Sequence, residues 1–229
     1  MRRICERPIV TTFPNSPKLI KGGLVLVDPE SAQVQRVISL QYNADTLTRK
    51  LQAQEAGGEG GGNRAEPMRF KGPAVETISF EADIDATDQL EFPEQNANAI
   101  AFGIAPQLAV LEALSHPSTA QLQRVDSQAS SGTLEIAPML APLLLFVWGK
   151  SRIIPVKLAD FSITEEAFDP ALNPIRAKVT FSLRVLTVDD LGFSSKGGAL
   201  FMAYLQGKEK LAGKVQPVSF SALGIGGIS

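Results

Sequence analysis

The carboxylates between residues 83 and 94 are the side chains of this chain whose types and spacing come nearest to a metal site. Asp83, Asp85, Asp88 and Glu94 lie within twelve positions, and oxygen ligands at such spacing are typical of a calcium-binding loop. A loop numbered from Asp83 would place Asp88 at its sixth position, where the sharp turn requires glycine. It would also need a helix immediately before it.

The residues before these carboxylates alternate in polarity with a period of two, which predicts a half-buried strand rather than a helix. One face carries only apolar residues, namely Ile78, Phe80, Ala82 and Ile84. We therefore interpret the carboxylates as the solvated face of a strand that ends in a turn, where Asp85 or Asp88 caps the backbone. A metal site at Asp83, Asp85, Asp88 and Glu94 remains the alternative interpretation.

No other set of residues indicates catalysis. His116 is the single histidine, so a histidine-based metal cluster cannot form, and the sequence has no G-x-S-x-G element that could supply a nucleophilic serine. Glu165 and Glu166 could in principle hydrolyse a glycoside, but one Trp and two Tyr are few for a sugar-binding cleft. Trp148 lies in the apolar run LLLFVW and is expected in the core. We predict a protein that is not an enzyme and needs no cofactor.

Composition and charge exclude further classes of function. The 229 residues are 44% hydrophobic and 20% charged, with a formal net charge of −2, which is typical of a globular protein with a sizeable core. No basic cluster with interleaved aromatic residues is present, so we predict no nucleic-acid partner. The longest apolar run, residues 142–148, is too short to span a bilayer. With Cys5 as the single cysteine and no apolar segment after the basic start, the protein is expected in the cytoplasm.

Most of the regular elements are predicted to be antiparallel strands. Expected strands cover residues 21–28, 34–42, 75–85, 143–148, 153–164 and 176–186. Pro155 indicates that its strand begins at a sheet edge or a bulge. Residues 106–115 predict the main helix, because leucines recur at helical spacing between two prolines.

Other segments fit more than one structure. Residues 46–54 and 198–206 suit either a helix or a strand, and residues 121–138 are polar and remain unassigned. Residues 56–63 (AGGEGGGN) predict a mobile linker within a glycine-rich loop, 56–66. The tail, residues 216–229, is expected to be loosely held unless a partner covers it.

Several stretches, in their order and spacing, resemble the tube-domain family of contractile injection systems, the phage-tail-like particles of bacteria. These stretches are LVLVD followed by VISLQYNADTLTRKLQ, then GPAVETISFEADIDATD, PQLAVLEAL and the long block LLLFVWGKSRIIPVKLADFSITEEAFDPALNPIRAKVTFSLRVL. The resemblance covers residues 20–190. The chain has Asn43-Ala44-Asp45 where the family often has Asn-Pro-Glu.

The resemblance implies a mainly β (α+β) fold: an antiparallel, barrel-like β-sandwich of the tail-tube type, flanked by the 106–115 helix and a possible C-terminal helix. We expect an N-terminal arm over 1–18, the tube-like domain over 19–190, and an extension over 191–229 that is too short for a full LysM module.

The implied function is structural, as a hexameric ring that joins the inner tube to the spike and baseplate. Its expected partners are copies of itself, the spike protein, neighbouring tube or tube-initiator rings and baseplate proteins, without direct membrane insertion. Assembly is expected in the bacterial cytoplasm. Candidate subunit-interface residues are Asp83, Asp85, Asp88, Asp169, Arg176 and Lys178. The alternative function is a stand-alone β-sandwich that binds carbohydrate or peptide.

Overall fold

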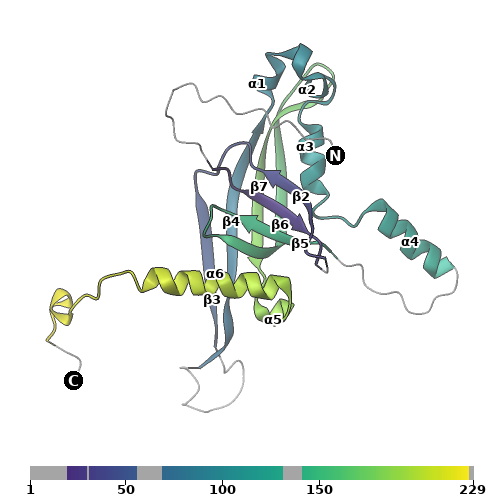
Figure 1. Ribbon diagram of the computed structural model, residues 1–229. Coiled ribbons are helices and arrows are strands. Elements are labelled where there is room, and N and C mark those ends of the chain that lie inside the picture. The colour runs from purple at the N-terminus through teal and green to yellow at the C-terminus, as the bar shows by residue number, and fades with distance from the viewer. Residues whose placement is uncertain (1–19, 30, 56–68, 131–140, 227–229) are drawn as a thin grey trace.

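The computed structural model describes residues 20–29, 31–55, 69–130 and 141–226 (Figure 1). The predicted N-terminal arm, 1–18, and the glycine-rich loop, 56–66, lie outside the described residues. The centre of the fold is a seven-stranded antiparallel sheet with the order β2-β1-β5-β6-β7-β4-β3. Its strands are β1 (Gly23–Val27), β2 (Val34–Ser39), β3 (Leu47–Glu55), β4 (Phe70–Asp85), β5 (Leu143–Val147), β6 (Ile153–Phe168) and β7 (Pro174–Val185). The predicted mainly β fold is confirmed, and residues 46–54 form a strand.

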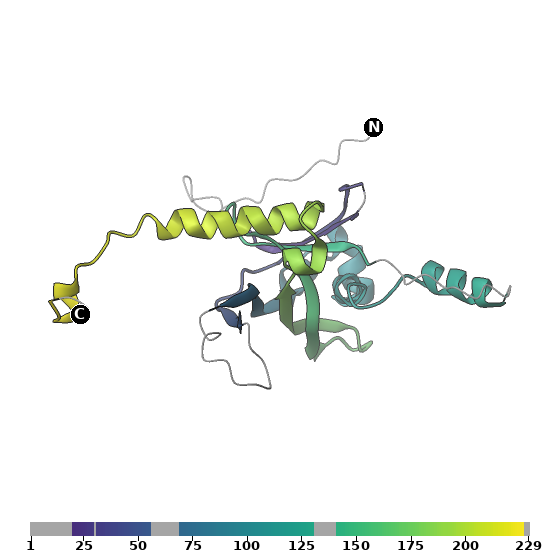
Figure 2. The same ribbon diagram turned by 90° about the horizontal axis from the view of Figure 1, so that it is seen from below.

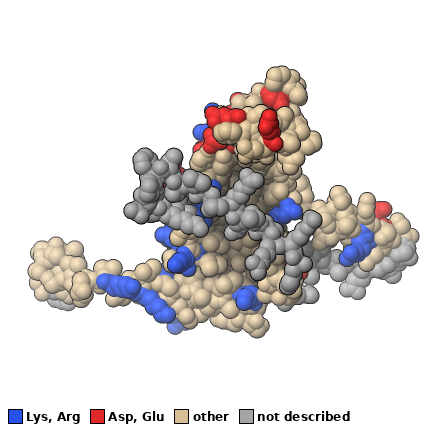
Figure 3. All heavy atoms as spheres, turned by 45° about the horizontal axis from the view of Figure 1, so that its top comes forward, with Lys and Arg blue, Asp and Glu red and all other residues tan. Residues whose placement is uncertain are grey.

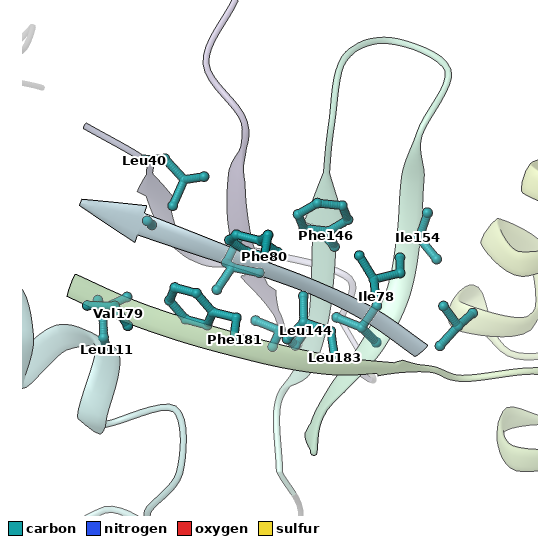
Figure 4. Packing of buried hydrophobic residues seen from close by; sticks show 14 of the residues in the cluster. Leu40, Ile78, Phe80, Leu111, Leu144, Phe146, Ile154, Val179, Phe181 and Leu183 are labelled. Atoms are coloured by element: carbon teal, nitrogen blue, oxygen red, sulfur yellow. The ribbon is translucent and has the colours of Figure 1, made fainter. Parts of the chain in front are cut away.

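The sheet curls over its own core. β6 and β7 separate β4 from β5, so a flat sheet would hold these two strands roughly 14 Å apart. Instead Phe80 of β4 stacks on Phe146 of β5, with 5.3 Å between ring centroids, and also on Phe181 of β7 at 4.9 Å (Figure 4). Among the described strands β2 and β3 do not pair with each other. The sheet is therefore barrel-like but open.

The period-two pattern of the sequence corresponds to the inner face of this curl. Ile78, Phe80 and Ala82 of β4 are buried, and so are the four alternating residues of β7, Val179, Phe181, Leu183 and Val185. Each Val, Leu, Ile or Phe side chain removed from water in this way contributes about 1.5–3 kcal/mol. Trp148 stacks on Phe146 at 5.7 Å and packs against the core as expected.

β6 is an interior strand over most of its length, but the ladder with β7 begins only at Val156, so the strand starts with one open side, as predicted from Pro155. β6 pairs with β5 on one side and with β7 on the other. The Pro155 carbonyl accepts a hydrogen bond from the Leu186 N–H, one residue beyond the last pair of the β6–β7 ladder. Because the amide and carbonyl of one residue point to the same side of a strand, the missing N–H falls where β7 has already ended.

Two helices pack where apolar residues recur at helical spacing. The predicted main helix is α3 (Ala105–Glu112), which buries Leu108 and Leu111. The ambiguous segment 198–206 belongs to a longer helix, α6 (Lys196–Ala212), which begins after the Ser195 cap and buries Phe201 and Tyr204. α5 (Val188–Leu191) precedes it, and a capping box between Thr187 and Asp190 stabilises its N-terminus.

Of the remaining helices, three short ones form one end of the molecule, and α4 (Thr119–Ser130) projects from it. α1 (Thr87–Leu90), η1 (Pro93–Gln95) and α2 (Ala97–Phe102) connect β4 to α3. The backbone passes so close at Gly103 that a Cβ there would lie 2.0 Å from the Pro174 carbonyl oxygen, which joins this end to β7. Within the unassigned polar segment, residues 121–130 belong to α4, which buries no residue and stands away from the sheet; residues 131–138 lie outside the described residues. Figures 1 and 2 show α6 and the short η2 (Phe220–Leu223) extending on the other side.

Candidate functional site

A ladder of alternating charges covers the outer face of β4 and β7. The strand register places Asp83 opposite Lys178 and Asp85 opposite Arg176. Arg176 Nε donates to Asp85 Oδ2 at 2.8 Å, while Lys178 Nζ lies 3.5 Å from Glu81 Oε1. The hydrogen bond to Asp85 raises the pKa of Arg176, and the Glu81 charge raises that of Lys178. Four of the candidate interface residues are therefore neighbours on one exposed face.

Asp85 also closes the turn from β4 into α1. Its Oδ1 accepts the Thr87 N–H at 2.7 Å as well as the Thr87 hydroxyl. The hydroxyl bond is the main cause that lowers the pKa of Asp85; burial opposes it, and the Thr87 N–H and Arg176 support it. The predicted cap is confirmed at Asp85, whereas Asp88 lies exposed on α1.

The described part of the chain gives no support to the alternative interpretation, a metal site at Asp83, Asp85, Asp88 and Glu94. The four carboxylates are distributed over β4, α1 and η1, and a strand rather than a helix precedes them. Asp85 is bonded to Thr87 and Arg176, and Glu94 is exposed. Within the described residues, no three His, Cys, Asp or Glu side chains converge closely enough to hold a metal ion.

Asp169 organises the turn between β6 and β7. Its Oδ1 accepts the backbone N–H groups of Ala171 and Asn173, both at 2.8 Å, and its Oδ2 accepts from Asn173 Nδ2 at 2.8 Å. These bonds, with the Asn173 side chain first, lower the pKa of Asp169. The turn contains Leu172 at φ 65° and exposes its side chain. Asp169 thus shapes the turn that brings β7 back along β6.

The other candidates for catalysis are separate from one another. His116 lies exposed between α3 and α4. Glu165 and Glu166 are both exposed on β6, and the Glu166 charge helps to raise the pKa values of Arg176 and Lys178. Acidic side chains gather at the end of the molecule that carries α1 (Figure 3).

Sequence reasoning missed a second charged cluster, which lies beneath α6. Glu76 of β4 is only 3% exposed. Arg49 of β3 donates to its Oε1 at 2.6 Å, and Lys208 of α6 donates to its Oε2 at 2.8 Å. The Tyr204 hydroxyl donates to Glu76 at 3.0 Å and accepts from Arg49 at 2.9 Å. The Lys208 ammonium also lies 4.1 Å from the centre of the Tyr204 ring.

The electrostatics of this Glu76 network favour the charged carboxylate. Burial alone would raise the pKa of Glu76, but the hydrogen bonds and charges of Lys208 and Arg49 outweigh it and hold the pKa below its ordinary value. Burial is also the main cause that raises the pKa of Tyr204. A buried carboxylate with this many donors is satisfied, so the network attaches α6 to the sheet through two strands.

A groove lies at the opening of the curled sheet, between the outer edge of β2 and α3. Its volume is about 370 Å³, and most of its lining is apolar: Val37, Ile38, Leu40, Ala82, Ile84, Pro106, Val110, Leu111 and Phe181, with Ser39, Gln41, Asp83 and Gln107. Gln41, two residues after β2, bonds to the last residue of β4 beside the groove. Its side-chain amide donates to the Asp85 carbonyl at 2.7 Å, and its carbonyl accepts the Asp85 N–H at 3.0 Å. We call this feature the β2–α3 groove.

The comparisons with known proteins identify the family. A search of curated proteins gave no match, and no described helix combines the length and apolar character needed to cross a membrane. The family described as contractile injection system tube protein matches residues 24–191, a span that runs from β1 through α5. Because this match covers most of the sequence, the chain belongs to the contractile injection system tube protein family.

Proposed function

We propose that this chain forms a hexameric ring that joins the inner tube of a contractile injection particle to its spike and baseplate. The observation that carries the proposal is the family match from β1 through α5, which assigns the whole curled sheet to a tube subunit. In this role the protein is mechanical rather than catalytic and needs no cofactor. Its ring assembles in the bacterial cytoplasm before it is incorporated into the particle.

The open sheet gives a physical reason for assembly. No described strand pairs with the outer edge of β2 or of β3, and Val37 and Leu51 on these strands are 66% and 54% exposed. Unpaired edges of this kind attract further strands and promote aggregation. Neighbours that cover both edges around a closed ring satisfy these backbone groups and stop the pairing from continuing.

Elements outside the curled sheet support a role between two different layers. α6 and the residues after it lie beyond the family match, and α4 projects without burying a residue. A plain conduit needs only contacts to copies of itself, whereas an adaptor also needs a surface for the spike. We assign α4 and the acidic α1 end, with Asp83, Asp88 and Lys178, to contacts with adjoining rings.

Two measurements test this proposal. Native mass spectrometry and electron microscopy of the purified full chain should show rings of six. In the producing bacterium, deletion of the gene should leave spikes detached from tubes, and the tagged protein should co-purify with both. A protein that stays monomeric at micromolar concentration and binds neither component would contradict the ring. In that case the β2–α3 groove would favour the alternative, a peptide-binding module, which a peptide-array binding assay would detect.

A further inference from the structure

The residues after α6 expose an unusual number of apolar side chains. We define the C-terminal tail as residues 213–226. Its exposed apolar residues are Val215, Val218, Phe220, Leu223 and Ile225. Val218 is 74% exposed, and residues 216–219 have no helical structure. A concentration of exposed apolar side chains in so short a segment indicates a binding element rather than a solvated end.

The pattern of the tail suits an extended conformation. Val218 and Phe220 alternate with Ser219 and Ser221, so a strand formed by unwinding the first residues of η2 (Phe220–Leu223) would place two apolar side chains on one face and two hydroxyls on the other. Lys210 and Lys214 come just before these residues. The tail therefore presents an apolar face, with Lys214 near its start.

The β2–α3 groove is complementary to such a segment. Its lining is mainly apolar and includes Ala82 and Ile84 from the inner face of β4, which suits the apolar face of the tail. The Leu40 N–H donates to the Gly22 carbonyl, so Leu40 directs its backbone groups toward β1. Because these groups alternate in direction along a strand, Val37 and Ser39 direct theirs outward, where an added strand could pair with them.

The tail and the groove lie on opposite sides of the molecule. α6 carries the tail away from the sheet on one side, and α3 lies on the other (Figures 1 and 2). A contact between two such different surfaces is heterologous, and repetition of it around an axis generates a ring. The same contact within one chain would require the tail to reverse the direction that α6 gives it.

We propose that the C-terminal tail of one subunit docks in the β2–α3 groove of its neighbour as an added strand, with Val218 and Phe220 in the groove. This inference rests on the proposed ring and names the segment that covers the outer edge of β2. The Glu76 network then has an assembly role, since it fixes the helix from which the tail departs.

Disulfide trapping between two differently labelled chains tests the contact directly. In a Cys5→Ser background, chains carrying Val110→Cys in α3 are mixed with chains carrying Val218→Cys in the tail, and the mixture is oxidised. We expect a disulfide-linked pair that contains one chain of each kind. The matched control replaces Val110→Cys by Leu122→Cys, an exposed position on α4 outside the groove, and should give no such pair. A single chain carrying both groove and tail cysteines shows whether the tail reaches its own groove.

Paired substitutions in the tail measure the effect of docking on assembly. The double variant Val218→Asp/Phe220→Asp should raise the concentration at which half of the chains are assembled by about tenfold or more, because two buried apolar contacts are lost. Ser219→Asp/Ser221→Asp introduces the same charge on the other face and should change this concentration much less.

The outcomes separate the docking from the ring itself. Rings that form without the Val110–Val218 cross-link, or that tolerate Val218→Asp/Phe220→Asp, would overturn the docking and leave the ring standing. A monomer under all conditions would overturn both. An intramolecular disulfide without an intermolecular one would show that the tail covers its own groove, which also overturns the proposal.

Discussion

The two charged clusters use the same kinds of residue in very different surroundings. The ladder on β4 and β7 lies at the surface, where water screens each pair and supplies alternative partners. The Glu76 network is buried between β3, β4 and α6, so its carboxylate has no such replacement. Charges that look alike in the sequence therefore contribute unequally to stability. The buried cluster stabilises the fold, and the exposed one is available for assembly.

Among the substitutions in the two clusters, truncation of Glu76 should lower the stability of the fold the most. Glu76→Ala leaves Arg49 and Lys208, which are 29% and 32% exposed, without their shared acceptor and should lower the free energy of unfolding by about 2–3 kcal/mol. Urea denaturation followed by circular dichroism measures this change. The control is Glu81→Ala in the same strand, whose partner Lys178 lies at the surface, and which should shift stability by about 0.5 kcal/mol at most. Equal effects of the two variants would refute the contrast between the clusters.

Acidification should remove part of the same stabilisation. The pKa of Glu76 is lower in the folded chain than its ordinary value of 4.5, so its contribution is complete above that value and is lost as the pH falls through the folded pKa. Asp85 and Asp169 also have lowered pKa values, so the useful quantity is the stability difference between wild type and Glu76→Gln. We expect this difference to be constant near neutral pH and to shrink below about pH 4.5. A difference that does not vary with pH would mean that the carboxylate charge contributes nothing.

Loss of the Tyr204 hydroxyl should destabilise the fold less than truncation of Glu76 does. Tyr204→Phe keeps the ring in place and removes one donor to Glu76 and one acceptor for Arg49. We expect a loss of about 1–1.5 kcal/mol in the free energy of unfolding. Tyr42→Phe removes the same atom at a residue that is 48% exposed and should have little effect, which chemical denaturation of the two variants will compare.

The contrast also explains which features could be predicted from the sequence. Strands β4 and β7 were predictable because their inner faces alternate without interruption. The burial of Glu76 had a signal as well, since it falls on the same face as Ile78, Phe80 and Ala82. Its partners had none, because Arg49 is 27 residues away and Lys208 is 132 residues away in sequence, and their approach depends on the path of the whole chain.

Other features depend on the same long-range geometry. α4 escaped prediction because its sequence is largely polar and its few apolar residues are not buried against the sheet. The acidic cluster was predictable as a strand face, but the pairing of Asp85 with Arg176 across 91 residues was not. Likewise, no local pattern indicates that Gln41 bonds to the end of β4, which sets the shape of the β2–α3 groove.

The smallest effect is expected from the surface ladder, and it separates two roles of one residue. Asp85→Asn weakens the ion pair with Arg176 and the turn bond to Thr87, whereas Arg176→Gln weakens only the ion pair. Arg176→Gln should therefore leave the denaturation midpoint nearly unchanged, and Asp85→Asn should lower it slightly. High salt should abolish the Arg176 effect and leave the turn effect, because screening acts on the exposed pair. If instead Arg176→Gln destabilises the chain as much as Tyr204→Phe does, the ladder would be part of the fold and not a surface kept free for a neighbouring ring.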